Sequence, residues 1–296
     1  MESYKNISID IENISVYGTC LAKNLLRWLN LENRNEKISP YGTLFNPFSI
    51  NFEISRLLGD SNFTYFVDNS KTFYDQCRTW TGFQSLDDLK SFNQVFDKQA
   101  KRYLLESSAI FISYGVIETW VNKNHPQTIY NKIPIDFNEI DRTIWMAHLP
   151  SKELLIKTIC NTIDMIQKMV GWSIPIIFAV CPVSIKFTML KVAKEQINRI
   201  TKDTLTESIK VAISQKSNCL YFEAYEIFNK LKEQDTVVQL DGRHLLPKTL
   251  EQIYNAFMLF CNGTPKVNHN NFWVPYYNQY GKIIGKIFND NRIELG

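Results

Sequence analysis

One stretch near the N-terminus decides the fold: residues 14–22, Ile14-Ser15-Val16-Tyr17-Gly18-Thr19-Cys20-Leu21-Ala22. Its first half is apolar and bounded by polar residues, which predicts a buried strand that ends near Tyr17. The segment that follows, residues 21–30, has apolar residues at spacings of three and four, which predicts a helix. Ligands of open parallel sheets gather at the carboxyl ends of the strands. Cys20 is therefore predicted to lie where chemistry usually occurs.

Short apolar runs and longer helical segments alternate along the rest of the chain. Strands are predicted at residues 13–17, 109–114, 174–180 and 219–222, and helices at 21–30, 86–105, 153–170, 190–213 and 248–260. This alternation is typical of a doubly wound α/β fold, in which helices flank both faces of a mainly parallel sheet. The expected architecture is a three-layer sandwich like that of flavodoxin.

The 296 residues are predicted to form a single domain with two insertions and an extension. The insertions lie near residues 51–82 and 122–141, which lack clean periodicity and are expected to roof a site. The C-terminal extension, residues 261–296, is rich in aromatic residues. It is expected either to pack back on the domain or to meet a partner, and packing is preferred.

Charge and hydropathy exclude several classes of partner. The 33 basic and 30 acidic residues form no blocks, so no nucleic-acid partner is expected. The longest apolar stretch, residues 173–187, is interrupted by Pro175, Pro182 and Lys186, so no membrane span is expected. Residues 1–13 lack the apolar core of a signal peptide. We therefore expect a cytoplasmic protein.

Neither a metal site nor a resident cofactor is expected. The six cysteines are widely spaced, with no C-x-x-C pair. Cys160, Cys181 and Cys219 lie in apolar runs, and are interpreted as core residues. The turn after the first strand has a single glycine, Gly18, so a dinucleotide fingerprint is absent, and no Walker A loop is found.

Three residue types needed for nucleophilic catalysis occur in two distant segments. Cys20 is predicted at a helix start, where unpaired amides favour a thiolate and lower its pKa. Gly18 permits the tight turn before it and removes a side chain from the path of an incoming substrate, so it is counted with the expected substrate-binding residues. The segment 241–244, Asp-Gly-Arg-His, offers His244 as a proton shuttle and Asp241 as the group that orients it. The other histidines, His125, His148 and His269, are interpreted as surface residues.

Seven short motifs occur in an order that resembles the bacterial GSCFA-domain proteins, which are related to the SGNH (GDSL-like) hydrolases. The turn G-T-C-L-A at 18–22 resembles the Gly-Ser-Cys-Phe-Ala turn of that family. The other similar segments are S-P-Y-G-T-L-F-N-P-F-S at 39–49, S-Y-G at 113–115 with Glu118, Trp120 and Asn131, V-C-P-V at 180–183 with Thr188, Asn198 with Thr201-Lys202, residues 222–227, and D-G-R-H at 241–244. One departure is Ile117, which stands where the related hydrolases have Asn.

The resemblance implies an SGNH-like fold and a set of site residues. Cys20 matches the nucleophile, with Thr19 as the alternative nucleophile; we prefer Cys20 because a thiolate is the stronger nucleophile near pH 7. Thr19 is then expected to shape the turn and to cap the helix with its hydroxyl. His244 is the expected base, oriented by Asp241. The expected oxyanion donors are the amides of Cys20 and Gly42 and the side chain of Asn46, with Gly115 in reserve.

The activity implied is that of an esterase or O-acyltransferase on an ester-bearing substrate, with a glycan or another cell-envelope component as the expected substrate class. Acyl-CoA would serve as the acyl donor of a transferase, and no other cofactor is required. The alternative from another class is a glycan-binding module that keeps the scaffold without turnover. Ile117 and Thr19 are the features that favour this alternative.

Overall fold

The structure is a computed structural model of the whole chain. It describes residues 9–11, 13–29, 43–59, 65–67, 71–78, 81–130, 143–186, 188–262, 272–280 and 282–296. The predicted site residue Gly42, His269 and residues 131–141 of the predicted insertion at 122–141, with the motif residue Asn131 among them, lie outside these residues.

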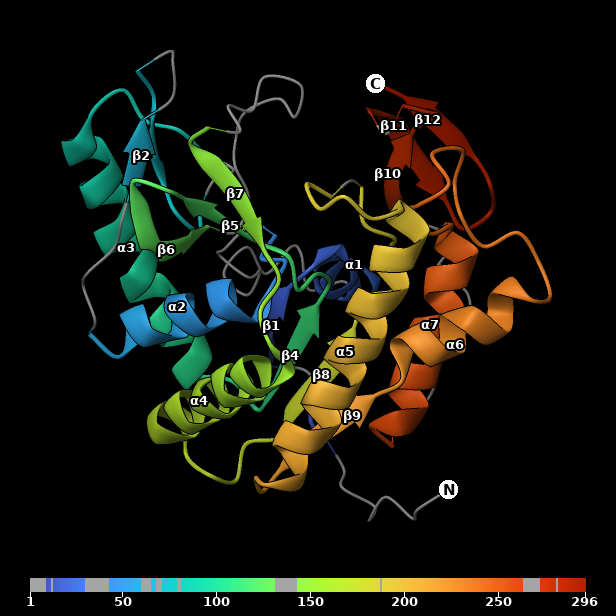
Figure 1. Ribbon diagram of the computed structural model, residues 1–296. Helices are drawn as coiled ribbons and strands as arrows, with labels where there is room; N and C mark the ends of the chain where they lie inside the picture. Colours follow the sequence, from blue (N-terminus) through green and yellow to red (C-terminus); the bar gives the residue numbers. More distant parts are fainter. Residues whose placement is uncertain are drawn as a thin grey trace.

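A four-stranded parallel sheet forms the centre of the molecule (Figure 1). Its order is β1-β4-β8-β9, with bounds Ile14–Gly18, Ala109–Tyr114, Ile176–Val180 and Cys219–Phe222. The register aligns Gly18 with Ser113 and Ser113 with Ala179, so the strands end at one common edge. This confirms the predicted α/β fold and all of its predicted strands, with shifts of one or two residues at β1 and β8.

Helices cover both faces of the sheet, as the alternation of strand and helix segments along the chain predicts. Alternate strand residues face two separate cores: Val16, Phe111 and Ala179 pack with helices α1, α6 and α7. Ile110, Ile112 and Phe178 pack with helices α2, α3, α4 and α5. Because both faces are buried, the strands are continuously apolar rather than alternating. The helices are α1 Cys20–Trp28, α2 Pro47–Leu57, α3 Leu86–Leu105, α4 Lys152–Val170, α5 Lys194–Ser214, α6 Ala224–Lys232 and α7 Pro247–Phe260.

Helices α2 and α6 were not predicted from the sequence. Helix α2 begins where the Asn46 side chain accepts a hydrogen bond from the Ser49 amide and Pro47 occupies the first turn. The sequence of α2 lacks a clear helical pattern of apolar residues, because the charged residues Glu53 and Arg56 are buried together with apolar Ile54. Residues 51–57 of the segment predicted as an insertion, 51–82, belong to α2. Helix α5 also starts four residues later than predicted, because 190–192 form part of a loop.

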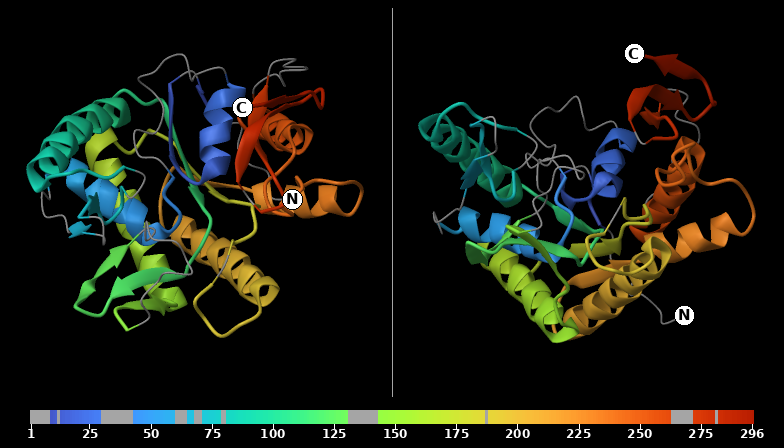
Figure 2. Two further views of the ribbon diagram at one scale, coloured as in Figure 1. Left: turned by 90° about the horizontal axis from the view of Figure 1, so that it is seen from above. Right: turned by 45° about the horizontal axis from the view of Figure 1, so that its top comes forward.

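Three small antiparallel sheets surround the central one. The first insertion contains the hairpin of β2 Tyr65–Val67 and β3 Phe73–Asp75. The strands β5 Thr119–Asn122, β6 His125–Tyr130 and β7 Trp145–His148 form a sheet in the order β6-β5-β7. The C-terminal extension forms β10 Trp273–Tyr277, β11 Ile283–Phe288 and β12 Ile293–Leu295, which lie on the α1 and α7 side of the molecule (Figure 2).

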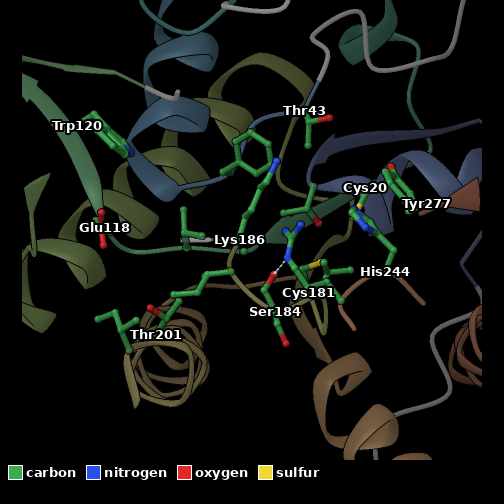
Figure 3. A pocket seen from close by; sticks show the side chains of 18 residues that line it. Cys20, Thr43, Glu118, Trp120, Cys181, Ser184, Lys186, Thr201, His244 and Tyr277 are labelled. Atoms are coloured by element: carbon green, nitrogen blue, oxygen red, sulfur yellow. Dashed lines mark hydrogen bonds between the residues drawn. The ribbon is translucent and has the colours of Figure 1, made fainter. Parts of the chain in front are cut away.

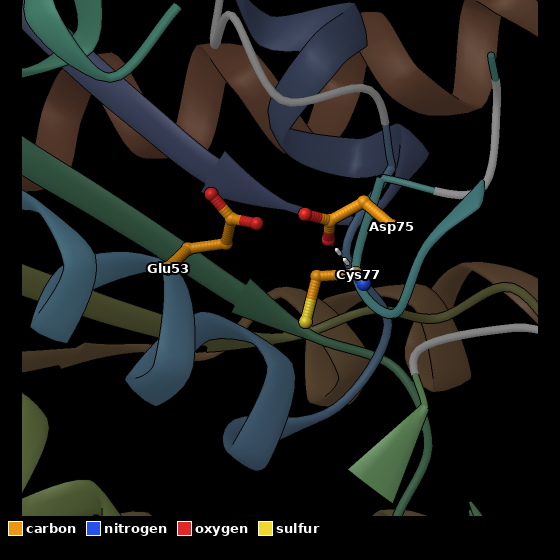
Figure 4. Close-up of side chains that lie close together, drawn as sticks. All are labelled: Glu53, Asp75 and Cys77. Atoms are coloured by element: carbon orange, nitrogen blue, oxygen red, sulfur yellow. Dashed lines mark hydrogen bonds between the residues drawn. The ribbon is translucent and has the colours of Figure 1, made fainter. Parts of the chain in front are cut away.

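A network of buried charges joins α2, β3 and α3. The Arg78 guanidinium donates to the Glu53 carboxylate at 2.8 Å and to Asn93 at 2.8 Å, and the side chains of Arg78 and Glu53 are both 0% exposed. Arg56 donates to Asp75 at 2.8 Å. Glu53, Asp75 and Cys77 bring ligand-type atoms together (Figure 4), but these two carboxylates already hold guanidinium groups, which a metal ion would have to displace.

Arg78→Met should destabilise the protein strongly, because it leaves the buried Glu53 carboxylate without its main partner. Breaking a buried pair in this way costs about 3–5 kcal/mol of unfolding free energy. Urea denaturation followed by circular dichroism measures the loss. Arg102→Met is the matched control, since its ion pair with Glu106 is about half exposed on both sides and such pairs contribute about 1 kcal/mol or less. Similar losses in the two variants would contradict this account.

Candidate active site

A cavity of about 330 Å³ opens at the carboxyl edge of the central sheet (Figure 3). Its wall contains residues that follow β1, β4 and β8, together with Arg243 and His244 from the loop before α7 and Tyr277 from β10. In Figure 3, Cys20, His244 and Tyr277 gather at one end and Glu118 and Trp120 lie at the other. The predicted residues Thr19, Cys20, Gly115 and His244 therefore share one cavity wall.

Gly18 makes the turn from β1 into α1 sterically possible. Its φ is +117°, and a Cβ atom there would lie 2.0 Å from the Ser113 carbonyl oxygen. Only a glycine fits a backbone with this φ at this close approach. The turn is held to β4 by the Thr19 amide, which donates to the same Ser113 oxygen at 3.2 Å. Gly18 therefore has the turn-forming role predicted for it.

Thr19 occupies the N-cap position of α1 but makes no side-chain cap, so the predicted capping role of its hydroxyl is wrong. The hydroxyl instead pairs with the Ser113 hydroxyl at 2.5 Å, and Thr19 is 3% exposed. Because Ser113 is itself on β4, this bond ties the first helix start to the neighbouring strand. Thr19 thus stabilises the turn beside Cys20.

Gly115 allows the turns after β1 and β8 to meet across the end of β4. A Cβ atom on Gly115 would lie 2.8 Å from the Thr19 side chain and 3.9 Å from the Cβ of Cys181. The strands β1 and β8 are not neighbours, since β4 lies between them. The missing side chain at Gly115 therefore leaves room for the Thr19 side chain at the place where the two turns meet.

Cys20 and Cys181 form a hydrogen-bonded thiol pair in this cavity. The bond to Cys181, together with burial, raises the pKa of Cys20 well above its usual value. Burial acts against a thiolate on Cys181 as well, but the bond from Cys20 and the charge of Lys202 lower the pKa of Cys181 to about 6. The hydrogen bond to Cys181 and burial thus outweigh the helix start, so the expectation of a lowered pKa at Cys20 is wrong, and the two thiols carry one negative charge as a pair.

Lys202 is a fully buried cation that stabilises this charge. It lies in α5 at 0% exposure, and its Nζ donates to the carbonyl oxygens of Gly115 at 2.8 Å and Val183 at 3.1 Å. Burial lowers the pKa of Lys202 to about 8. The lysine therefore fastens the turns after β4 and β8 to α5 while it supports the thiol pair. The cysteine Cys181, interpreted from the sequence as a core residue, is 2% exposed but also lines the cavity.

Asp241 and His244 form the hydrogen-bonded pair that their spacing predicts. The Asp241 Oδ2 atom lies 2.5 Å from His244 Nδ1, and its Oδ1 atom accepts from the amides of Arg243 and His244 at 3.0 Å each. Against the effect of burial, these bonds lower the pKa of Asp241, so the carboxylate stays ionised. Burial lowers the pKa of His244 in spite of Asp241. The imidazole is therefore neutral near pH 7, with Nε2 available to accept a proton.

The predicted oxyanion donors differ in what they can do. The Cys20 amide is in the first turn of α1, and no acceptor for it occurs among the described residues. The Gly115 amide already donates to the Phe45 carbonyl at 2.9 Å, so the reserve donor is engaged. The Asn46 side chain is buried and caps α2, and it does not line the cavity. The role of Asn46 stays a prediction, as does that of Gly42, which lies outside the described residues.

The residues after Gly115 hold the loop on the far side of the cavity. The Glu118 carboxylate accepts from the Met189 amide at 3.0 Å and pairs with the Thr188 hydroxyl. Ile117, which stands in place of an Asn, is 1% exposed and packs in the core rather than lining the cavity. Arg243 Nε donates to the Ser184 carbonyl at 2.9 Å and joins this loop to the one that carries His244.

Sequence reasoning missed four residues of this site: Cys181, Lys202, Arg243 and Tyr277. Cys181 and Lys202 are in segments that resemble family motifs, and this position in a motif could have indicated that they belong to the site. Tyr277 had no signal, since nothing in an Asn-rich aromatic tail indicates which ring contacts His244. Of the other histidines, His148 is exposed, as predicted.

Comparison with known proteins gives one match. The model of the GSCFA family matches residues 13–257. No curated protein and no solved structure matches the chain. None of the described helices is both long enough and apolar enough to cross a membrane. The matched residues include Cys20, Cys181, Lys202, Asp241 and His244, and end before β10.

The thiol pair should be alkylated by iodoacetamide with a pH dependence that other cysteines do not share. A pKa of about 6 means that the thiolate forms above that pH, so labelling at Cys20 or Cys181 should rise between pH 5 and 7 and then level off. Cys160 is the control within the same chain, because burial raises its pKa and its labelling should still rise at pH 9. Peptide mapping by mass spectrometry measures both. One shared pH curve for the pair and Cys160 would contradict the assignment.

Proposed function

Because the chain belongs to the GSCFA family, we propose that it is an acyl-ester enzyme whose acyl-enzyme intermediate forms on Cys20. The observation that carries this proposal is that Cys20 shares a cavity wall with His244, whose ring is hydrogen-bonded to Asp241. A nucleophile, a base and a group that orients the base are the parts that acyl transfer needs. The resemblance of the G-T-C turn and the late D-G-R-H segment to those of SGNH hydrolases supports the same chemistry.

The first half of the reaction attaches the acyl group to the chain. The Cys20 sulfur attacks the carbonyl carbon of the ester, and the proton of its thiol passes to His244 Nε2. The negative charge that develops on the carbonyl oxygen is stabilised by amides at the start of α1, the Cys20 amide among them. The bond to the leaving oxygen then breaks, and His244 returns the proton to that oxygen. The products are a free alcohol and a thioester on Cys20.

The second half of the reaction removes the acyl group. His244 takes a proton from water or from an acceptor hydroxyl, whose oxygen attacks the thioester carbonyl, and then protonates the departing Cys20 sulfur. Asp241 stays ionised throughout and stabilises the imidazolium that forms twice in the cycle. No hydrogen bond joins Cys20 to His244 in the described residues, so that contact has to tighten when substrate binds, as is common in such sites.

The cavity suits a small ester group on a larger substrate. Its volume of about 330 Å³ is at the lower end of the range for small-molecule sites. Apolar Phe45, Trp120 and Ile185 line it beside the charged Lys186 and Arg243. A second cavity of about 240 Å³ shares Cys20, His244 and Tyr277 with the first. Two cavities that meet at one nucleophile would accommodate an acyl donor and an acceptor, which supports the transferase form of the proposal with acyl-CoA as donor.

Incubation with p-nitrophenyl acetate should give a burst of p-nitrophenol equal to the enzyme concentration, because acylation of Cys20 releases the phenol before the thioester turns over. Mass spectrometry should find one acetyl group on the Cys20 peptide. Cys20→Ala should abolish both signals, while Thr19→Ala should retain them. A burst that survives in Cys20→Ala but not in Thr19→Ala would make Thr19 the nucleophile. Absence of any burst would favour the glycan-binding module.

Asp241→Asn and His244→Ala should each slow turnover by roughly 10²-fold or more, because the pair acts as one general base. The double variant should be scarcely slower than His244→Ala alone, since residues of one catalytic unit are not additive. Rates with an ester substrate measure the cycle, and circular dichroism checks the fold. Losses that multiply in the double variant, or a wild-type rate in His244→Ala, would remove the pair from the mechanism.

A further inference from the structure

The C-terminal sheet reaches the candidate active site through one aromatic ring. Tyr277 is the last residue of β10, and its ring is stacked on the imidazole of His244 with centroids 3.6 Å apart and planes 5° from parallel. Both rings line the cavity that contains Cys20 (Figure 3). Tyr277 lies beyond residue 257, where the family match ends. This contact therefore comes from a part of the chain outside the matched region.

We propose that Tyr277 is a positioning residue, which holds the His244 imidazole in the plane needed for proton transfer to and from Cys20. This inference rests on the proposed function for the role of His244. The bond from Nδ1 to Asp241 fixes one edge of the ring but still allows the ring to turn about that bond. A flat ring packed against the imidazole face blocks this rotation, because a turned imidazole would collide with it.

A buried glutamine fixes the two stacked residues relative to each other. Gln239 is 5% exposed, and its Nε2 atom donates to the carbonyl oxygens of Leu245 at 3.0 Å and Pro275 at 3.1 Å. Its Oε1 atom accepts from the Tyr277 amide at 3.0 Å. The backbone N–H of Gln239 also donates to the His244 carbonyl oxygen at 2.7 Å. One side chain thus joins the loop that carries His244 to the strand that carries Tyr277.

The strand itself is anchored in the main core, so the Tyr277 ring has a fixed support. Phe272 and Val274 are 5% and 2% exposed and belong to the core formed with α1 and α7. The Phe272 ring packs against Tyr254 of α7, and Trp273 lies under the Arg27 guanidinium of α1 at 4.4 Å. Strand β11 pairs along β10 and adds buried Ile287. The extension therefore packs back on the molecule, as the preferred sequence interpretation has it.

The charged groups near His244 come from three segments. Asp241 and Arg243 are in the same loop as His244. Lys186 and Cys181 are in the loop after β8, and Cys20 is at the start of α1. None of these groups changes when Tyr277 is replaced. Because burial is the main cause that lowers the pKa of His244, removal of the ring that covers it should raise that pKa toward its ordinary value.

Tyr277→Ala, Tyr277→Leu, Tyr277→Phe and, as the control from the same extension, Tyr280→Ala test this role. Tyr280 is 74% exposed. In Tyr277→Ala and Tyr277→Leu, kcat with an ester substrate should fall roughly tenfold or more, since misplaced catalytic groups cost that much. The acidic limb of the pH profile should move to higher pH. Tyr277→Phe keeps the flat ring and should behave like wild type, as should Tyr280→Ala.

Nuclear magnetic resonance titration of the His244 ring supplies a readout that needs no turnover. The four histidines of the chain give few signals, and His244→Ala assigns the one of interest. The His244 pKa should rise in Tyr277→Ala and Tyr277→Leu and stay at the wild-type value in Tyr277→Phe. If the wild type shows no ester turnover, the proposed function fails while this titration still decides whether Tyr277 controls the ring. An unchanged His244 pKa together with unchanged kcat in both Tyr277→Ala and Tyr277→Leu would overturn the proposal, and so would a loss of activity in Tyr277→Phe equal to that in Tyr277→Ala.

Discussion

The site depends on the absence of a side chain at the ends of two neighbouring strands. At Gly18 a Cβ atom would overlap the Ser113 carbonyl, and at Gly115 it would overlap the Thr19 side chain. Without those atoms the turn after β1 packs directly on β4, and the turn after β8 reaches across the end of β4 to meet it. Cys20 and Cys181 lie in these two turns, and their thiols meet in the cavity that the turns border. The close packing of these backbone segments therefore determines where the reactive side chains of the cavity lie.

Buried charge is the second feature that organises the molecule. Among the described residues, the hydrogen bonds of Lys202 go to the carbonyl oxygens of two active-site turns and to no carboxylate. A buried ammonium is costly unless hydrogen bonds or an anion compensate it, and here the thiol pair provides the negative charge nearby. The Arg78 and Glu53 network lies on the same face of the sheet but is different, because its charges are paired directly and connect α2, β3 and α3 rather than two active-site turns. One set of charges supports packing, and the other supports a site.

The base of the site is assembled from a loop and a sheet that are distant in the sequence. Asp241 orients the His244 ring from its own turn, Gln239 ties that turn to β10, and Tyr277 covers the imidazole face. The extension that carries Tyr277 is held through its own apolar residues in the core with α1 and α7. A C-terminal segment that looks like an appendage in the sequence is therefore part of the wall beside the nucleophile.

The sequence by itself determined the α/β class, the four central strands and most of the long helices, because apolar periodicity is a local property that the printed residues carry. It also determined the turn at Gly18 and the pairing of Asp241 with His244, since a spacing of three residues in a turn restricts what those side chains can reach. Helix α2 could not be predicted, because the buried Glu53 and Arg56 interrupt its apolar pattern. Their burial depends on a charge network with β3 and α3, which are distant in the sequence. Only the tertiary structure decided that Cys181 joins Cys20, that Lys202 stabilises the pair and that Tyr277 stacks on His244. These contacts join residues separated by tens to hundreds of positions, and their existence depends on how closely backbones approach, which no local pattern of residues encodes.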